Sequence, residues 1–131
     1  MNDAAQSDQL WQEVCAALRY HFMTGHGCID TINRLWRKDP FVAQPQSLPV
    51  IQRRGILVTK EQWGLKRLWP FIHEKRITDL APGELQRPLI ILRFAGVDHL
   101  RDGRRRINHW QRVSDQGPHE VLIVDARQGA S

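Results

Sequence analysis

The stretch Asp102-Gly103-Arg104-Arg105-Arg106 joins an apolar run that ends near Leu100 to a helix-like segment at 107–113. It predicts the end of a strand, a glycine turn and the first turn of a helix. The first N–H groups of a helix lack backbone partners, and the helix dipole favours negative charge at that end. With three guanidinium groups beside it, this helix start is expected to bind an anion, and phosphate is the obvious ligand class.

The segments on either side of the arginine run predict a small sheet. Residues 89–94 are almost continuously apolar, Gly96 interrupts the run, and 97–100 resume it, a pattern typical of a hairpin. After the helix, Gln116-Gly117-Pro118 marks a turn, and 120–125 form another apolar strand. We therefore expect an α+β fold, in which a small mixed sheet carries the helix that follows the arginine run on one face.

Residues 1–40 predict an N-terminal helical hairpin that covers the sheet. Ser7 or Asp8 is expected to cap the first helix. The second helix, at 29–36, is expected to end at Asp39-Pro40. The apolar stripe of the first helix, with a residue at every fourth position, consists of Leu10, Val14, Leu18 and Phe22.

Residues 41–76 predict a connector and a third helix. Proline and glutamine are frequent at 41–54, so this part is predicted to be an extended connector. Short strands at 50–52 and 55–58 are compatible with the sequence. Thr59-Lys60-Glu61-Gln62 fits a capping box, so a helix is expected to follow it and to kink at Pro70. The chain of 131 residues is then expected to be one domain, with the sheet at 77–125.

Charge and cysteine content narrow the class of protein. The excess of 19 Lys and Arg over 14 Asp and Glu gives a net charge of +5, which is common among nucleic-acid-binding domains. Cys15 and Cys28 are too few for a disulfide scaffold, and with His21 and His26 they match no zinc-finger spacing, so reduced thiols and no metal ligands are expected. Without a signal peptide or an apolar run of roughly 18 residues, a cytoplasmic location and no membrane partner are expected.

Residues 77–125 resemble the core of the ParB/sulfiredoxin fold. The resemblance rests on three motifs in order: Gly83-Glu84-Leu85-Gln86-Arg87-Pro88-Leu89-Ile90-Ile91-Leu92-Arg93, the arginine run itself, and His119-Glu120-Val121-Leu122-Ile123-Val124. They are similar to the glycine-glutamine-proline strand, the Gly-Glu-Arg-Arg turn and the closing strand of partition proteins. The family implies a compact core that handles nucleotides or nucleic acids, in bacterial, phage or mobile-element settings.

The chain also departs from that family. Arg87 is inserted between the motif Gln and Pro, and Arg104 replaces the Glu that usually follows the motif Gly. Sulfiredoxin has its reactive cysteine at the position of Arg104, so the resemblance does not extend to the sulfiredoxin reaction. His109 and Trp110 stand where partition proteins have small residues.

The candidate site residues follow from the run and from the resemblance. Phosphate or nucleic acid is expected to bind at Gly103, Arg104, Arg105 and Arg106. Asp102 is a catalytic candidate that would orient an arginine, cap the helix or hold Mg²⁺ beside a bound nucleoside triphosphate. Glu84 is a second catalytic candidate, which would act as a base; the alternative is an ordinary surface loop residue. His109 is a third, which would act as a general acid or base; the alternative is an ordinary packed histidine. The same two alternatives apply to His99.

Three functions remain open at this point. The first is a ParB-like module that recognises phosphate and binds a nucleotide or nucleic acid, with the N-terminal helices as a surface for a protein partner. The second is an enzyme of the same fold, a phosphodiesterase or nuclease, an NTP hydrolase or a phosphotransferase. The third is an adaptor or inhibitor without catalysis, because a fold alone does not fix a function.

Overall fold

The computed structural model describes residues 3–22, 25–38, 51–71, 80 and 82–126. Its helices are α1 (Asp3–Ala17), α2 (Cys28–Lys38), α3 (Leu65–Leu68) and α4 (Arg104–Val113). Its strands are β1 (Ile56–Trp63), β2 (Leu89–Phe94), β3 (Val97–Asp102) and β4 (His119–Ala126). The described residues also include short 3-10 helices at η1 (Arg19–His21), η3 (Trp69–Phe71) and η4 (Glu84–Gln86).

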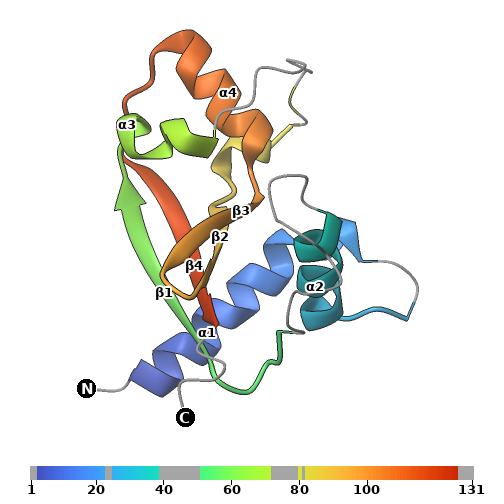
Figure 1. Ribbon diagram of the computed structural model, residues 1–131. Helices are drawn as coiled ribbons and strands as arrows, with labels where there is room; N and C mark the ends of the chain where they lie inside the picture. The colour runs from blue at the N-terminus through green and yellow to red at the C-terminus, as the bar shows by residue number, and fades with distance from the viewer. Residues whose placement is uncertain (1–2, 23–24, 39–50, 72–79, 81, 127–131) are drawn as a thin grey trace.

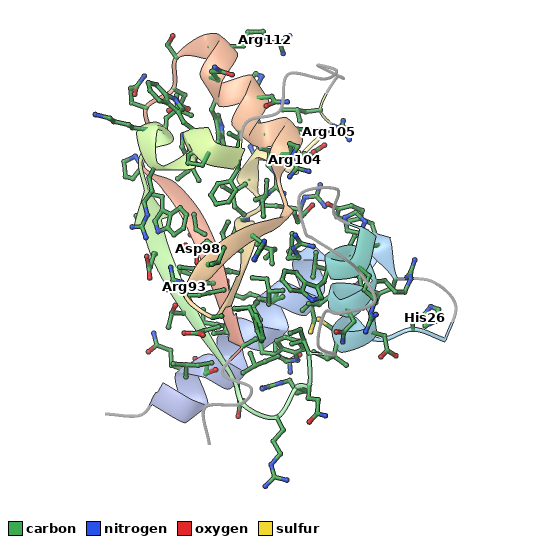
Figure 2. The ribbon with its side chains drawn as sticks, in the orientation of Figure 1. His26, Arg93, Asp98, Arg104, Arg105 and Arg112 are labelled. Atoms are coloured by element: carbon green, nitrogen blue, oxygen red, sulfur yellow. The ribbon has the colours of Figure 1, made fainter. Side chains whose placement is uncertain are left out.

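The four strands form one mixed sheet in the order β1-β4-β2-β3 (Figure 1). β4 pairs antiparallel with β1 and parallel with β2, while β2 and β3 form an antiparallel hairpin. The α+β class and the mixed sheet are therefore confirmed. An ion pair fixes the hairpin near its turn, where Arg93 Nε lies 2.6 Å from Asp98 Oδ1 (Figure 2).

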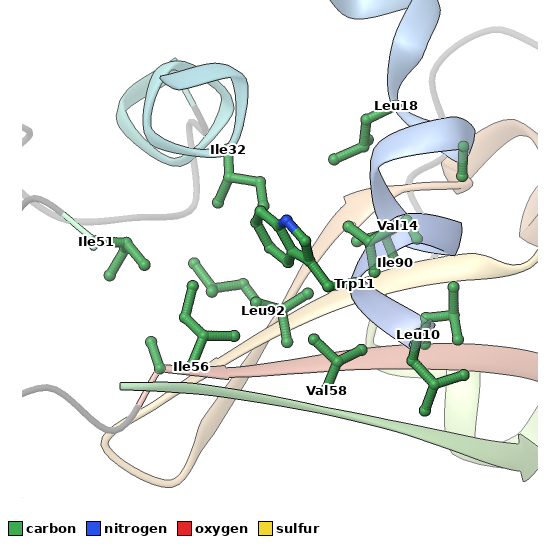
Figure 3. Close-up of a cluster of buried hydrophobic side chains, with 14 of the residues drawn as sticks. Leu10, Trp11, Val14, Leu18, Ile32, Ile51, Ile56, Val58, Ile90 and Leu92 are labelled. Atoms are coloured by element: carbon green, nitrogen blue, oxygen red, sulfur yellow. The ribbon is translucent and has the colours of Figure 1, made fainter. Parts of the chain in front are cut away.

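Each face of the sheet is covered by a pair of helices. Ile90 and Leu92 point into a cluster with α1 and α2 (Figure 3), whereas Leu89 and Ile91 point into a second cluster with α3 and α4. This alternation follows from the period of two along a strand, and it explains why β2 reads as a continuous apolar run. Burying one such side chain contributes about 1.5–3 kcal/mol, so the central strands β2 and β4 anchor both layers.

The hairpin, helix and closing strand after Leu89 agree with their predicted ranges, and so does α2. The end predicted for α2 at Asp39-Pro40 lies outside the described residues, as do Val50 and most of the connector. Ile51 and Gln52 are described and are not in a strand. In the part of the chain that the structure describes, no helix has the length and apolarity needed to cross a membrane.

The capping box predicted at residues 59–62 is wrong. These residues lie within β1, which pairs with β4 from Ile56 to Trp63. Of the residues described between β1 and position 71, Leu65–Leu68 and η3 are helical. Hydrogen bonds to a neighbouring strand along eight residues outweigh one local cap. The sheet therefore begins well before residue 77.

The predicted N-cap of the first helix is wrong as well. α1 begins at Asp3, so Ser7 lies inside it, and its buried hydroxyl accepts a hydrogen bond from the backbone N–H of Val58 at 2.8 Å. The serine thereby joins α1 to the edge strand β1. Asp8 pairs instead with Arg53, at 2.7 Å.

Candidate functional site

A glycine with a left-handed backbone conformation links the end of β3 to the start of α4. Gly103 has a φ of +121°, and its carbonyl accepts the first helical hydrogen bond, from Ile107 N at 3.1 Å. A Cβ at this position would lie 2.1 Å from Cδ2 of the buried Leu89. Glycine is therefore required here both for the backbone turn and for the close approach to β2.

This turn forms one wall of a cavity of about 230 Å³. η1 contributes Tyr20 and His21, and the other walls come from η4 and from the end of β3. Four arginines line the cavity: Arg87, Arg101, Arg104 and Arg105. The structure thus brings arginine residues from three segments of the chain to the N-terminal end of α4, where the helix dipole favours an anion. The guanidinium of Arg101 packs on the ring of Trp36, 5.5 Å from its centroid.

Arg106 has a different role from its two neighbours. Its side chain is completely buried and does not line the cavity. Nη1 donates to the carbonyl oxygens of Arg87 and Pro88, at 2.6 and 2.9 Å, and Nη2 donates to Asp102 at 2.9 Å. The prediction that Arg106 contacts phosphate is therefore not supported, because the folded chain uses its guanidinium to hold the segment before β2.

Arg104 and Arg105 remain at the cavity, at the start of α4 and at the opposite end of that helix from Arg112 (Figure 2). The side chain of Arg105 is about half exposed, and its Nη2 lies 3.6 Å from Oε1 of Glu84. Consecutive residues of a helix point in different directions, which separates these two arginines from Arg106.

Asp102 connects the cavity to the buried arginine. One carboxylate oxygen accepts a hydrogen bond from Arg106, and the other accepts one from the hydroxyl of Tyr20 at 2.7 Å. His21 Nε2 lies 3.5 Å from that second oxygen. Burial alone would raise the pKa of Asp102, but His21, the charge of Arg106 and the Tyr20 hydroxyl together lower it. Of its three predicted roles, Asp102 fulfils that of orienting an arginine.

Tyr20 lines the cavity although no motif in the sequence marks it. The guanidinium carbon of Arg87 lies over its ring, 4.4 Å from the ring centroid, and its hydroxyl donates a hydrogen bond to Asp102. Burial, and then the hydrogen bond and the charge of Asp102, raise the pKa of Tyr20 to about 12. The signal missing from the sequence is proximity, because Tyr20 and Asp102 are 82 positions apart.

Glu84 is a buried residue of the cavity and not a surface loop residue. The positive φ of Gly83, +79°, starts the η4 turn that directs Glu84 inwards. Only 6% of the residue is exposed, so its carboxylate faces the cavity and the Arg105 side chain. Glu84 therefore lies beside the arginine turn, as the sequence predicts.

The two histidines weighed as acid-base groups lie elsewhere. His109 is half-buried on α4 and does not line the cavity, and His99 packs edge-to-face on Trp36 at 4.6 Å between ring centroids. The histidine of the cavity is His21. The prediction that His109 acts in catalysis at the arginine turn is thus not supported by its position.

Within the described residues, no group of three or more His, Cys, Asp or Glu side chains is placed to hold a metal ion. The carboxylates nearest the arginines are Glu84 and Asp102, and Asp102 already accepts hydrogen bonds from Tyr20 and Arg106. The cavity therefore fits an anionic group better than a cation, and Mg²⁺ would fit only as a companion of a bound triphosphate.

Comparison of the chain with protein-family models, with curated proteins and with solved structures found no match.

Proposed function

We propose that this protein binds the phosphate groups of a nucleotide or a nucleic acid in the cavity at the start of α4. The observation that carries the proposal is the convergence of Arg87, Arg101, Arg104 and Arg105 on that cavity. Guanidinium groups match phosphate oxygens in charge and geometry, and the helix N-terminus adds favourable N–H dipoles.

The balance of charge in the cavity supports the same conclusion. Four arginines line it against two carboxylates, Glu84 and Asp102, and the charge of Asp102 is already neutralised from beneath by Arg106. The excess of positive charge at the wall therefore attracts anions, in keeping with the net charge of +5 on the whole chain. We propose in addition that the protein is ParB-like, on the basis of its motifs, and that it is located in the cytoplasm.

The test is fluorescence anisotropy of a labelled short single-stranded DNA, with unlabelled CTP and ATP as competitors. The pocket variant Arg104→Ala/Arg105→Ala is compared with Lys66→Ala/Arg112→Ala, which removes the same charge from exposed positions outside the cavity lining. If both arginines contact phosphates of the DNA, the slope of log affinity against log salt falls by about 1.4 in the pocket variant. The affinity also drops at least tenfold, while the control stays within about twofold of the original protein.

Equal losses in the two variants would mean that the charge acts non-specifically and would contradict a site at the cavity. Absence of binding by the original protein to DNA and to both nucleotides would sink the proposal. That result would favour the third function, an adaptor that works through a protein surface.

An enzyme of the nuclease or nucleotide-hydrolase kind is the second candidate, and buried Glu84 is the observation that favours it. A carboxylate 3.6 Å from Arg105, in the same cavity as the other arginines, is placed to act as a base on a water or hydroxyl near a bound phosphate. Glu84→Gln separates the two functions. In a binding module, this variant increases the affinity for phosphate because a negative charge is lost. In an enzyme, it abolishes the hydrolysis of DNA or nucleotide measured with Mg²⁺ present.

A further inference from the structure

α1 and α2 each bring one cysteine to a common point, away from the arginine cavity. Cys15 lies in the last turn of α1, and Cys28 is the first residue of α2. Both are free, partly exposed thiols that pack against the hydrophobic cluster between these helices and the sheet. A side-chain hydrogen bond joins the two thiols, so their sulfur atoms are already neighbours in the folded chain.

A guanidinium group is fixed beside this pair. Arg53 Nη2 lies 2.7 Å from Asp8 Oδ1, and its guanidinium carbon lies 4.7 Å from the ring centroid of Trp11. Asp8, Trp11 and Cys15 are spaced by three and four residues, so they share one face of α1. Arg53 is therefore held by the two residues that precede Cys15 on that face.

The segment that carries Arg53 is in turn anchored to α2. The side-chain amide of Asn33 donates to the carbonyl oxygen of Ile51 at 2.7 Å and accepts from its N–H at 2.6 Å. The cation and the two thiols thus lie within one structure made by α1, α2 and residues 51–53. None of these residues lines the arginine cavity.

Arg53 favours the ionised form of both thiols, and the hydrogen bond between them gives the two thiols different acidities. The hydrogen bond from Cys28, followed by the charge of Arg53, lowers the pKa of Cys15 against the opposing effect of burial. The pKa of Cys28 is raised, because it donates that hydrogen bond and because it is buried. An acidic thiol beside a less acidic one is the arrangement of an attacking and a resolving cysteine.

We propose that Cys15 and Cys28 form a thiol–disulfide site that is oxidised by peroxides. The Cys15 thiolate attacks one peroxide oxygen, the O–O bond breaks, and the leaving hydroxide takes a proton to become water. The sulfur of Cys28 then attacks the sulfenic acid on Cys15, the S–O bond breaks, and the proton of Cys28 leaves with the hydroxyl as a second water. Two thiols lose two electrons in total and hydrogen peroxide gains them, which leaves a disulfide between α1 and α2.

The first test uses the full chain with hydrogen peroxide and mass spectrometry. Trypsin cleaves after Arg19, between the two cysteines, so the disulfide is seen as a link between peptides 1–19 and 20–34. We expect this linked pair to form within one chain, with the loss of two hydrogens, and to disappear on treatment with dithiothreitol. Thiols that persist in excess peroxide, or links between chains only, would overturn the proposal.

The order of attack is tested with two single variants. In Cys28→Ser, the sulfenic acid on Cys15 persists and is trapped by dimedone, whereas in Cys15→Ser the remaining Cys28 is not labelled. The reverse labelling would contradict the assignment of the attacking cysteine. Should either variant fail to fold, the peptide map of the unaltered chain still decides whether the disulfide forms.

The part played by Arg53 has its own control. Arg53→Gln is expected to slow the alkylation of Cys15 by iodoacetamide several-fold near neutral pH, because less of the thiol is ionised. Arg54→Gln, at the exposed neighbouring position, removes the same charge and is expected to leave the rate unchanged. Equal rates in all three proteins would show that Arg53 does not activate Cys15.

Discussion

The Nη2 atom of Arg106 lies 2.9 Å from Oδ2 of Asp102, and the two side chains are 0% and 8% exposed. The pair lies directly beneath the turn that opens α4. The same guanidinium holds the backbone carbonyls of Arg87 and Pro88. One buried arginine therefore fixes the position of a cavity carboxylate and of the chain that enters β2.

Loss of Arg106 is expected to unfold the protein more easily. Arg106→Met keeps the volume of the side chain but leaves the Asp102 carboxylate and two buried carbonyl oxygens without their donor. The free energy of unfolding should fall by about 3–5 kcal/mol, the usual cost of breaking a buried ion pair. Urea denaturation measures this.

Arg112→Met is the matched control, because Arg112 is exposed at the other end of the same helix; its effect should stay within about 0.5 kcal/mol. The double variant Asp102→Asn/Arg106→Met should be more stable than Arg106→Met alone, since no charge is then left unpaired. Equal stability of these two variants would mean that the ion pair is not what Arg106 contributes.

The lowered pKa of Asp102 makes part of the stability depend on pH. A carboxyl whose pKa is lower in the folded chain than its ordinary value of 3.8 stabilises the fold above that value and loses its contribution as the pH falls below it. The difference in unfolding free energy between the original protein and Asp102→Asn should thus be largest near neutral pH and shrink in acid. A difference that does not change with pH would contradict the assigned pKa shift.

Tyr20 offers a direct spectroscopic readout, because it is the only tyrosine of the chain. Its ultraviolet absorbance should change with a pKa of about 12 and not at the ordinary value of 10.0. In Asp102→Asn the transition should move back towards the ordinary value, since the negative charge that favours the neutral phenol is gone. An ordinary tyrosine titration in the unaltered protein would mean that the contact with Asp102 does not exist in solution.

The glycine at the start of α4 is expected to tolerate no side chain. In Gly103→Ala the new Cβ meets Leu89 at 2.1 Å and the residue keeps a strained φ of +121°. Gly96→Ala, in the turn between β2 and β3, has a φ of +77° but no atom within 4 Å of the new Cβ. Thermal and urea unfolding should show a loss of about 1 kcal/mol for Gly96→Ala from backbone strain alone.

For Gly103→Ala the loss should be larger by about 1–3 kcal/mol, because overpacking is added to the strain. Equal losses in the two variants would show that the chain moves aside at Leu89 without cost.

The unit from β2 to β4 could be predicted because its signals are local. Gly96 marks the hairpin turn, Gly103 marks the end of β3, and the apolar run at Leu89–Phe94 has the composition of a strand covered on both faces. Each of these features lies within a few residues of the structure that it predicts.

The edge strand β1 could not be predicted in the same way. Thr59-Lys60-Glu61-Gln62 fits the start of a helix and also fits a strand with one face in water. What decides between them is the pairing of these residues with residues 120–123 of β4. That partner is about 60 positions away in the chain, and a short window of sequence does not contain it.

The arginine run shows the same limit within the site. Three adjacent residues of a helix point about 100° apart, so Arg104, Arg105 and Arg106 were bound to have different surroundings. Which of them is buried depends on the carbonyl groups of Arg87 and Pro88. The sequence identified the basic turn, and only the packing divides it into a structural arginine and two arginines of the cavity.

The position of β4 in the sheet also decides when the sheet can form. Because β4 follows β1, β2 and β3 in the chain and yet lies between β1 and β2, a growing or truncated polypeptide that ends before His119 leaves β1 without the strand it pairs with (Figure 1). Unpaired strand edges recruit other chains. Copies that lack β4 are therefore expected to aggregate, and formation of the sheet during synthesis must wait until β4 is available.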